Sequence, residues 1–165
     1  MISKKVCMLG GFAVGKTSLV SRFVRSIFSE KYMTTVGVKI DKKTVPVPGN
    51  EVDLVLWDIY GEDDFQKMRT SYLRGANGYL LVVDRTRRST LDVARDLHRL
   101  AVETAGPVPF LVLVNKADLA DQAELGTEEI NAVGRDGWTV IETSAKTGLG
   151  VEEAFTRLAV AMLSR

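Results

Sequence analysis

Short apolar runs alternate along the chain with segments whose apolar residues recur at helical spacing. Runs such as Val6–Leu9, Tyr79–Val83 and Phe110–Val114 are continuous, which indicates strands buried on both faces. Between these runs the apolar positions follow a period of about 3.6 residues. Strands that alternate with helices predict right-handed crossovers and a mostly parallel sheet. In such a sheet, ligands bind beyond the carboxyl ends of the strands, so the loops that follow strands are the ones to examine.

The remaining elements complete this alternation. Val38–Val47 and Val52–Trp57 predict two strands joined by a turn at residues 48–50, and Thr139–Ile141 predicts a shorter one. Pro46 and Pro48 have no backbone N–H to donate, so the first of these strands is expected at an edge of the sheet. The helical patterns cover Leu19–Ile27, Asp64–Arg74, Thr90–Thr104, Thr127–Arg135 and Val151–Met162.

Composition sets the class of protein. The 165 residues fit one domain over 1–165, and a content of 45% hydrophobic and 26% charged residues excludes a disordered chain. A net charge of +1 gives no bulk electrostatic attraction to nucleic acid or to an anionic membrane. A single cysteine, Cys7, rules out a disulfide framework and favours a reducing compartment. No apolar run reaches the roughly 18 residues of a membrane helix, so we expect a cytoplasmic protein without a transmembrane segment.

The loop after the first predicted strand has a spacing typical of phosphate binding. Residues 10–17 read Gly-Gly-Phe-Ala-Val-Gly-Lys-Thr, which matches G-x-x-x-x-G-K-[ST] with a strand before it and a helix after it. The backbone N–H groups of such a loop converge on one point and bind phosphate. Lys16 is expected to reach the β- and γ-phosphates, and the Thr17 hydroxyl to ligate Mg²⁺. The alternative is a chance glycine-rich turn, against which the flanking elements argue.

The loop after the fifth predicted strand indicates the base. It reads Asn115-Lys116-Ala117-Asp118, and one carboxylate can accept from both the N1–H and the exocyclic amine of guanine, a pair that adenine lacks. The stem of Lys116 can lie against the base plane. After the sixth strand, Ser144-Ala145-Lys146 offers a backbone N–H to guanine O6. A lone Asp after a strand is often only a helix cap, but its position at the same sheet end as the phosphate loop favours a base site.

Two further segments complete a nucleotide site. Asp58 ends the third predicted strand, where it can hold Mg²⁺ through water, and Gly61 lets its N–H approach a γ-phosphate. Thr35, in the segment between the first helix and the second strand, can close over Mg²⁺ and the γ-phosphate.

Taken in order, these five motifs resemble the Ras superfamily of small GTPases over essentially the whole chain. Residues 37–40, the Trp57–Asp58 junction and residues 71–76 are most similar to the Rab branch. The resemblance implies an α/β fold: a single P-loop NTPase (small GTPase) domain, whose six-stranded, mostly parallel sheet has five flanking helices and one antiparallel edge strand. It also implies a molecular switch that binds GTP and GDP with Mg²⁺ as cofactor and hydrolyses GTP to GDP.

The resemblance assigns roles to residues of this sequence. Implied nucleotide-binding residues are Gly11, Phe12, Ala13, Val14, Gly15, Lys16, Thr17, Ser18, Phe28, Thr35, Asp58, Gly61, Asn115, Lys116, Asp118, Ser144, Ala145 and Lys146. Implied Mg²⁺ ligands are Thr17, Thr35 and, through water, Asp58. Implied catalytic residues are Lys16, Thr35, Gly61 and Glu62. The resemblance also implies two switch regions, the first at Thr35 and the second starting at Asp58 and Gly61. Effector, exchange and activating proteins would meet these switch regions at Ile40, Trp57 and Tyr72, although Trp57 could instead be simple core.

The sequence departs from the family at the γ-phosphate. Glu62 stands where the family has its catalytic glutamine, Ile59-Tyr60 replaces Thr-Ala before Gly61, and Phe12 replaces a small residue. One interpretation is drift at tolerant positions. The other is a rebuilt site in which Phe12, Ile59 and Tyr60 pack together. The charge of Glu62 and the bulk of Phe12 predict slow hydrolysis.

The carboxyl end departs as well. Ras and Rab proteins usually carry prenylated cysteines in a flexible tail, whereas this sequence stops at Arg165 and holds only Cys7. No prenylation site is expected on this chain, so membrane association would need a partner or a missing tail.

Three functions remain open on sequence alone: a switch enzyme, a scaffold that binds guanine nucleotide without hydrolysis, and a phosphate-loop kinase. The base-site loops and the lack of a lid segment argue against the kinase. Two polar features are assigned no function: His98 is interpreted as part of a solvated helix face, and Arg85, Arg87 and Arg88 as a solvated loop.

Overall fold

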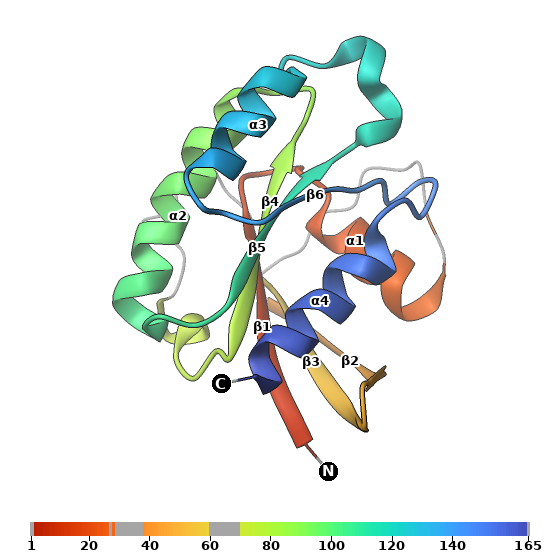
Figure 1. Ribbon diagram of the computed structural model, residues 1–165, viewed down its shortest axis with the longest axis vertical. Helices are drawn as coiled ribbons and strands as arrows, with labels where there is room; N and C mark the ends of the chain where they lie inside the picture. Colours follow the sequence, from red (N-terminus) through yellow and green to blue (C-terminus); the bar gives the residue numbers. More distant parts are fainter. Residues whose placement is uncertain (1, 27, 29–37, 60–69, 165) are drawn as a thin grey trace.

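The chain forms one six-stranded sheet flanked by helices (Figure 1). The computed structural model describes residues 2–26, 28, 38–59 and 70–164. The strand order is β2-β3-β1-β4-β5-β6. The strands are β1 (Ile2–Gly10), β2 (Val38–Val47), β3 (Asn50–Ile59), β4 (Gly78–Asp84), β5 (Phe110–Asn115) and β6 (Val140–Glu142). All neighbouring pairs are parallel except β2 with β3, and β2 lies at the edge, as its prolines predict.

Helices cover both faces of this sheet. They are α1 (Lys16–Arg25), α2 (Ser89–Ala105), α3 (Thr127–Arg135) and α4 (Val151–Leu163), with short 3-10 helices η2 (Thr70–Leu73) and η3 (Ala117–Gln122). α1 and α4 pack on one face, and α2 and α3 on the other (Figure 1). The expected helix at Asp64–Arg74 falls largely outside the described residues, and its last part is η2. No helix among the described residues is long and apolar enough to cross a membrane.

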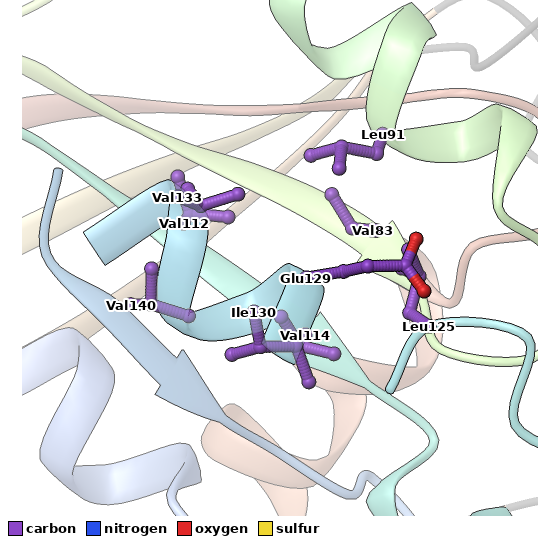
Figure 2. A pocket seen from close by; sticks show the side chains of 9 residues that line it. All are labelled: Val83, Leu91, Val112, Val114, Leu125, Glu129, Ile130, Val133 and Val140. Carbon is purple, nitrogen blue, oxygen red and sulfur yellow. The ribbon is translucent and has the colours of Figure 1, made fainter. Parts of the chain in front are cut away.

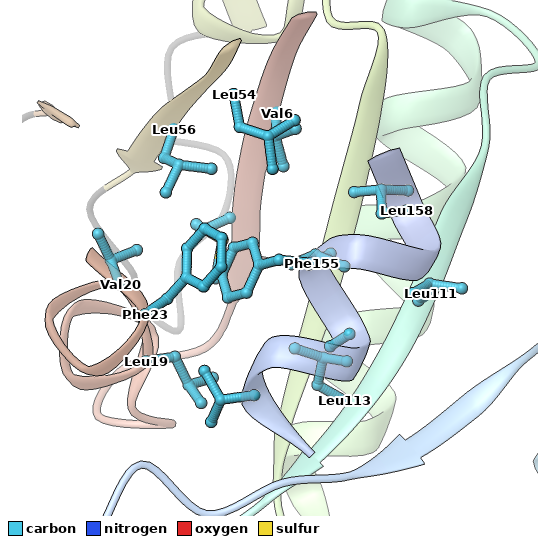
Figure 3. Packing of buried hydrophobic residues seen from close by; sticks show 14 of the residues in the cluster. Val6, Leu19, Val20, Phe23, Leu54, Leu56, Leu111, Leu113, Phe155 and Leu158 are labelled. Atoms are coloured by element: carbon cyan, nitrogen blue, oxygen red, sulfur yellow. The ribbon is translucent and has the colours of Figure 1, made fainter. Parts of the chain in front are cut away.

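The core beneath α1 and α4 is built around two aromatic rings. Phe23 of α1 and Phe155 of α4 stack with their centroids 4.0 Å apart and their planes 6° from parallel (Figure 3). Both side chains are almost fully buried against apolar residues of β1, β3 and β5. The stack joins the helix that follows the phosphate-binding motif to the last helix of the chain.

The opposite core contains two groups that the sequence left without a role. Cys7 in β1 is fully buried, and burial raises the pKa of its thiol to about 12. His98 is half-buried rather than part of a solvated helix face, because its ring lies 4.5 Å from that of Phe110 and 4.7 Å from that of Trp138. Its Nδ1 shares a 2.9 Å hydrogen bond with the hydroxyl of Tyr79. Both groups therefore belong to the core packing.

A small apolar hollow lies beneath α3, between that helix and the sheet (Figure 2). Val83, Val112 and Val133 are among its lining residues, and the carboxylate of Glu129 lies at its rim. None of the residues predicted to bind nucleotide lines it. The chemistry of this fold must therefore be sought at the ends of the strands.

Candidate nucleotide-binding site

The predicted motifs converge at one end of the sheet. The parallel strands β1, β3, β4, β5 and β6 run in the same direction, so the loops at their carboxyl ends lie together. Contacts between distant segments confirm this: the Asn115 amide donates to the carbonyl of Val14 at 3.0 Å. The Ser144 hydroxyl donates to the carboxylate of Asp118 at 2.7 Å. Loops separated by up to 103 residues thus form a single site.

The loop between β1 and α1 has the backbone of an anion cradle. Gly15 takes a φ of 103°, which glycine adopts without the penalty that a side chain adds. A Cβ at this position would also collide with the Asn115 amide. Ala13 takes a φ of 60° although it has a side chain, a conformation that needs support from its surroundings. The loop is therefore held in shape by neighbouring residues as well as by glycine.

Lys16 is buried at the start of α1. Its side chain lies under the loop, where Nζ donates to the carbonyls of Gly10 at 3.0 Å and Gly11 at 3.2 Å. Burial lowers the pKa of Lys16 to about 8; the nearby charge of Asp58 opposes this shift, and that of Arg87 adds to it. A lysine so placed is a cation without full solvation at the positive end of a helix, a site that favours a polyanion.

Thr17 and Asp58 supply neighbouring oxygen atoms. The Thr17 hydroxyl donates to Asp58 Oδ2 at 2.6 Å, and Asp58 is buried at the end of β3. A hydroxyl beside a carboxylate is a donor set that suits Mg²⁺, a hard cation that binds oxygen. Among the described residues no three His, Cys, Asp or Glu side chains gather into a metal site. A cation at Thr17 and Asp58 would therefore need further oxygen ligands, such as phosphates.

The base-site loops are fixed by hydrogen bonds among themselves. Thr143 donates to the Asn115 side chain at 3.1 Å, and Ser144 holds Asp118. Asn115 and Ser144 are buried, whereas Asp118 is exposed. Ala145, the residue after Ser144, is buried as well. The structure thus brings together Asn115, Lys116, Asp118, Ser144 and Ala145, as the sequence predicts, with the exposed side chain of Lys146 beside them.

Asp84 is a buried acid that the sequence analysis missed. It ends β4, its side chain is 1% exposed, and Lys116 Nζ lies 2.8 Å from its Oδ2. Burial acts to raise the pKa of Asp84, but hydrogen bonds from Lys116, Thr86 and Arg87 hold it below its ordinary value. An acid directly after a buried strand, at the same sheet end as the phosphate loop, was the available signal.

The basic segment after Asp84 is only in part the solvated loop that the sequence predicted, because Arg88 is exposed whereas Arg85 and Arg87 are half-buried. Arg85 pairs with Glu142 at 2.5 Å, and its side chain is only 15% exposed. Arg87 pairs with Asp84 at 3.0 Å, and Arg88 with Glu129 at 2.7 Å. Each of these three arginines thus forms an ion pair with an acid, and the three acids come from three different segments.

Several predicted residues lie at or beyond the described part of the site. Thr35, Tyr60, Gly61 and Glu62 lie outside the described residues. Phe12 and Phe28 are exposed, and Ser18 is half-buried in the first turn of α1. The predicted packing of Phe12, Ile59 and Tyr60 is described for two of its three residues. Ile59 is buried in the core beneath α2, whereas Phe12 is exposed.

The predicted protein-binding residues form one surface beside this site. Ile40 of β2 lies opposite Trp57 of β3 in the strand register and is 51% exposed. The rings of Trp57 and Tyr72 lie 6.1 Å apart, and Lys5 Nζ lies 3.7 Å from the centroid of the Trp57 ring. Trp57 is half-buried against the core below it, so it contributes both to packing and to this surface.

Comparison with known proteins places the chain in a family. Residues 5–164 match the family described as Ras family. The chain is 33% identical to the Ras-related protein Rab-10 of Caenorhabditis elegans over 98% of its own length and 81% of that relative. It is 34% identical to Rab-13 of Bos taurus, over 94% and 77% of the two chains, and to Rab-1 of Theileria parva, over 96% and 73%. The chain therefore belongs to the Ras family, as a Rab-like GTP-binding molecular switch.

Proposed function

We propose that the protein binds GTP and GDP with Mg²⁺, hydrolyses GTP slowly, and signals the difference through two switch segments. The observation that carries this proposal is the hydrogen bond between Asn115 and Val14. It joins the loop proposed to bind phosphate, at Lys16, to the loop proposed to bind guanine, at Asp118. A phosphate loop alone accepts any nucleotide. A carboxylate held by Ser144 at the correct end of the sheet adds a preference for guanine.

Phosphate binding is assigned to the loop N–H groups and to Lys16. When a nucleotide enters, the Lys16 ammonium can exchange its carbonyl partners, Gly10 and Gly11, for phosphate oxygens of opposite charge. Thr17, Thr35 and Asp58 would hold Mg²⁺, which neutralises charge between the β- and γ-phosphates when bound. The Gly61 N–H and Thr35 would sense the γ-phosphate.

Slow hydrolysis is proposed from residues 12 and 62. A neutral amide commonly orients the attacking water in GTPases, and the transition-state charge lies on phosphoryl oxygens. A glutamate has a reference pKa of about 4.3, so Glu62 would be ionised at pH 7 and would repel that charge. The exposed ring of Phe12 at the mouth of the loop would obstruct an arginine supplied by an activating protein. We therefore propose weak acceleration by activating proteins of that type.

The surface of Ile40, Trp57 and Tyr72 is proposed as the contact for effector, exchange and activating proteins. Ile40 is exposed and Trp57 and Tyr72 are half-buried, and all three lie next to the switch segments in sequence, so a partner bound there could respond to the state of those segments. The cation of Lys5 over the Trp57 ring adds a positive charge to this surface.

Nucleotide titration and a single-turnover assay test the proposal. Fluorescent GDP and GTP should bind with Mg²⁺ and resist competition by ATP, and γ-labelled GTP should release phosphate slowly in one turnover. Binding with no phosphate release above the uncatalysed rate would identify a non-hydrolysing scaffold instead. Equal competition by ATP and GTP would contradict the assignment of the guanine site.

A further inference from the structure

Arg87 connects the loop after β4 to the phosphate loop. Its Nη2 donates to the carbonyl of Phe12 at 2.5 Å, across 75 residues of sequence. Its Nε donates to Asp84 Oδ2 at 3.0 Å. One planar guanidinium thus bridges a buried carboxylate and a backbone carbonyl of the loop, which a planar fork of donors does well.

Asp84 orients this bridge together with Lys116. Lys116 Nζ lies 2.8 Å from the same Oδ2 and donates to the carbonyl of Ala13 at 3.0 Å. The other oxygen, Oδ1, accepts from the backbone N–H of Thr86 at 2.8 Å and from its hydroxyl at 2.6 Å. The carboxylate is therefore fixed on both oxygens, and it aligns two cations on successive carbonyls.

Three consecutive carbonyls of the phosphate loop are held in this way. Arg87 holds that of Phe12, Lys116 that of Ala13, and Asn115 that of Val14. In a trans peptide the carbonyl and the following N–H point in opposite directions. Donors that draw these carbonyls outward therefore turn the N–H groups of Ala13, Val14 and Gly15 toward the other side, where phosphate would bind.

The backbone of Ala13 explains why such support is needed. Its φ of 60° is unfavourable for a residue with a side chain. The peptide before Ala13 is held by Arg87 and the peptide after it by Lys116. Without the first of these, the peptide between residues 12 and 13 could rotate, and its N–H would no longer be preorganised for an anion.

We propose that Arg87 is a positioning residue that presets the Ala13 N–H for phosphate and slows nucleotide release by tying the phosphate loop to the Asp84–Lys116 pair of the base site. This inference rests on the proposed nucleotide binding. It predicts that Arg87 acts on the phosphate end of the nucleotide and not on the base.

The test compares Arg87→Ala, Arg87→Lys and the matched control Arg88→Ala. Arg88 is the adjacent cation, and its partners are Glu124 and Glu129, away from the phosphate loop. Release of fluorescent GDP is followed after addition of excess unlabelled GDP at saturating Mg²⁺. Arg87→Ala should release GDP about tenfold faster or more, because a charged hydrogen bond to the loop is lost. Arg87→Lys should be intermediate, and Arg88→Ala should stay within about twofold of the parent.

A second measurement separates positioning from general damage to the fold. Calorimetric titration with GDP and with GMP should show a larger loss for GDP in Arg87→Ala, because the preset N–H serves the phosphates farther from the base. Equal losses for GDP and GMP, or equally fast release in Arg87→Ala and Arg88→Ala, would overturn the inference. So would unchanged release in Arg87→Ala. Absence of GDP binding by the parent protein would instead contradict the proposed function.

Discussion

The Thr17 hydroxyl donates a 2.6 Å hydrogen bond to the Asp58 carboxylate. Thr17 lies in the first turn of α1 and Asp58 near the end of β3, so this contact joins the phosphate loop to the strand that leads into the proposed second switch. Both residues are expected to hold Mg²⁺, and their side chains already lie side by side. A change at either residue should therefore affect GTP, which shares a cation between β- and γ-phosphates, more than GDP.

Thr17→Asn is expected to yield a nucleotide-poor or GDP-preferring protein. The substitution removes the hydroxyl that would ligate Mg²⁺, and the cation matters most when the γ-phosphate is present. Affinities for GTP and GDP measured by fluorescence titration across a range of Mg²⁺ concentrations check this. Equal affinities for the two nucleotides at saturating Mg²⁺ would count against Thr17 as a ligand.

Asp118→Asn is expected to exchange guanine preference for xanthine preference. Xanthine carries an oxygen where guanine carries the amine. The amide introduced by the substitution can donate to that oxygen, whereas the carboxylate that it replaces can only accept. Loss of a charged hydrogen bond should weaken GDP binding by about tenfold or more. Competition between GDP and xanthosine diphosphate measures the ratio. Asp121→Asn, an exposed acid in the same helix η3, is the control and should leave that ratio unchanged.

Glu62→Gln combined with Phe12→Gly is expected to speed GTP hydrolysis. The double change removes a negative charge near the γ-phosphate and opens the mouth of the phosphate loop. Single-turnover phosphate release measures the effect, with and without an activating protein that supplies an arginine. The rate should increase most in the presence of the activating protein. If Glu62 instead had a pKa raised by desolvation and served as a general base, Glu62→Gln alone would slow the reaction. A fast parent rate lost in that single variant would establish the second account.

Nucleotide affinity is expected to fall as pH rises above about 8. The pKa of Lys16 is about 8 in the unliganded protein, and a bound polyanion favours the protonated form and so raises this pKa. Binding should therefore take up a proton above pH 8, with affinity roughly constant below it and falling by at most about tenfold per pH unit above it. Calorimetry in two buffers of different ionisation enthalpy counts the proton. Lys16→Arg, which stays protonated, should remove the uptake in whatever nucleotide it still binds.

Phe155→Ala is expected to destabilise the fold by about 3–5 kcal/mol, because it deletes one ring of a fully buried stack and leaves a cavity. Phe155→Leu should cost less. Urea unfolding of the GDP-saturated protein gives the difference, with Val160→Ala on the exposed side of α4 as the control. A loss below about 1 kcal/mol for Phe155→Ala would mean that the two helices repack around the gap.

One strand and one helix were predicted with their exact bounds because their signal is local. Val38–Val47 and Thr127–Arg135 match the structure at both ends, since burial and turn residues determine each within its own segment. The phosphate and base motifs were predicted for the same reason. The first part of the helix expected at Asp64–Arg74, over residues 64–69, and the γ-phosphate contacts of Thr35, Gly61 and Glu62 stay predictions, because those residues lie outside the described part of the chain.

The role of Arg87 could not be read from its neighbours in sequence. Three arginines within four residues resemble any solvated loop. Asp84 is only three residues from Arg87, but Glu142 and Glu129 come close to Arg85 and Arg88 only when β6 lies beside β5 and α3 packs against the sheet. The Phe12 carbonyl comes close to Arg87 only when β4 lies beside β1. Strand order is a property of the whole chain. The contact of Arg87 with Phe12 depends on it entirely.

The buried thiol of Cys7 has a practical consequence. The chain has one cysteine, its Sγ donates to the Tyr72 carbonyl at 3.4 Å, and a pKa of about 12 leaves almost no thiolate at neutral pH. Cys7 should therefore not react with maleimide dyes, so it need not be replaced before labelling. Leu149 is exposed, and its carbonyl accepts from the N–H of Ser144 in the base-site loop. A cysteine introduced at this position would carry the sole fluorophore. That fluorophore would report motion of the base-site loop with no other change to the sequence.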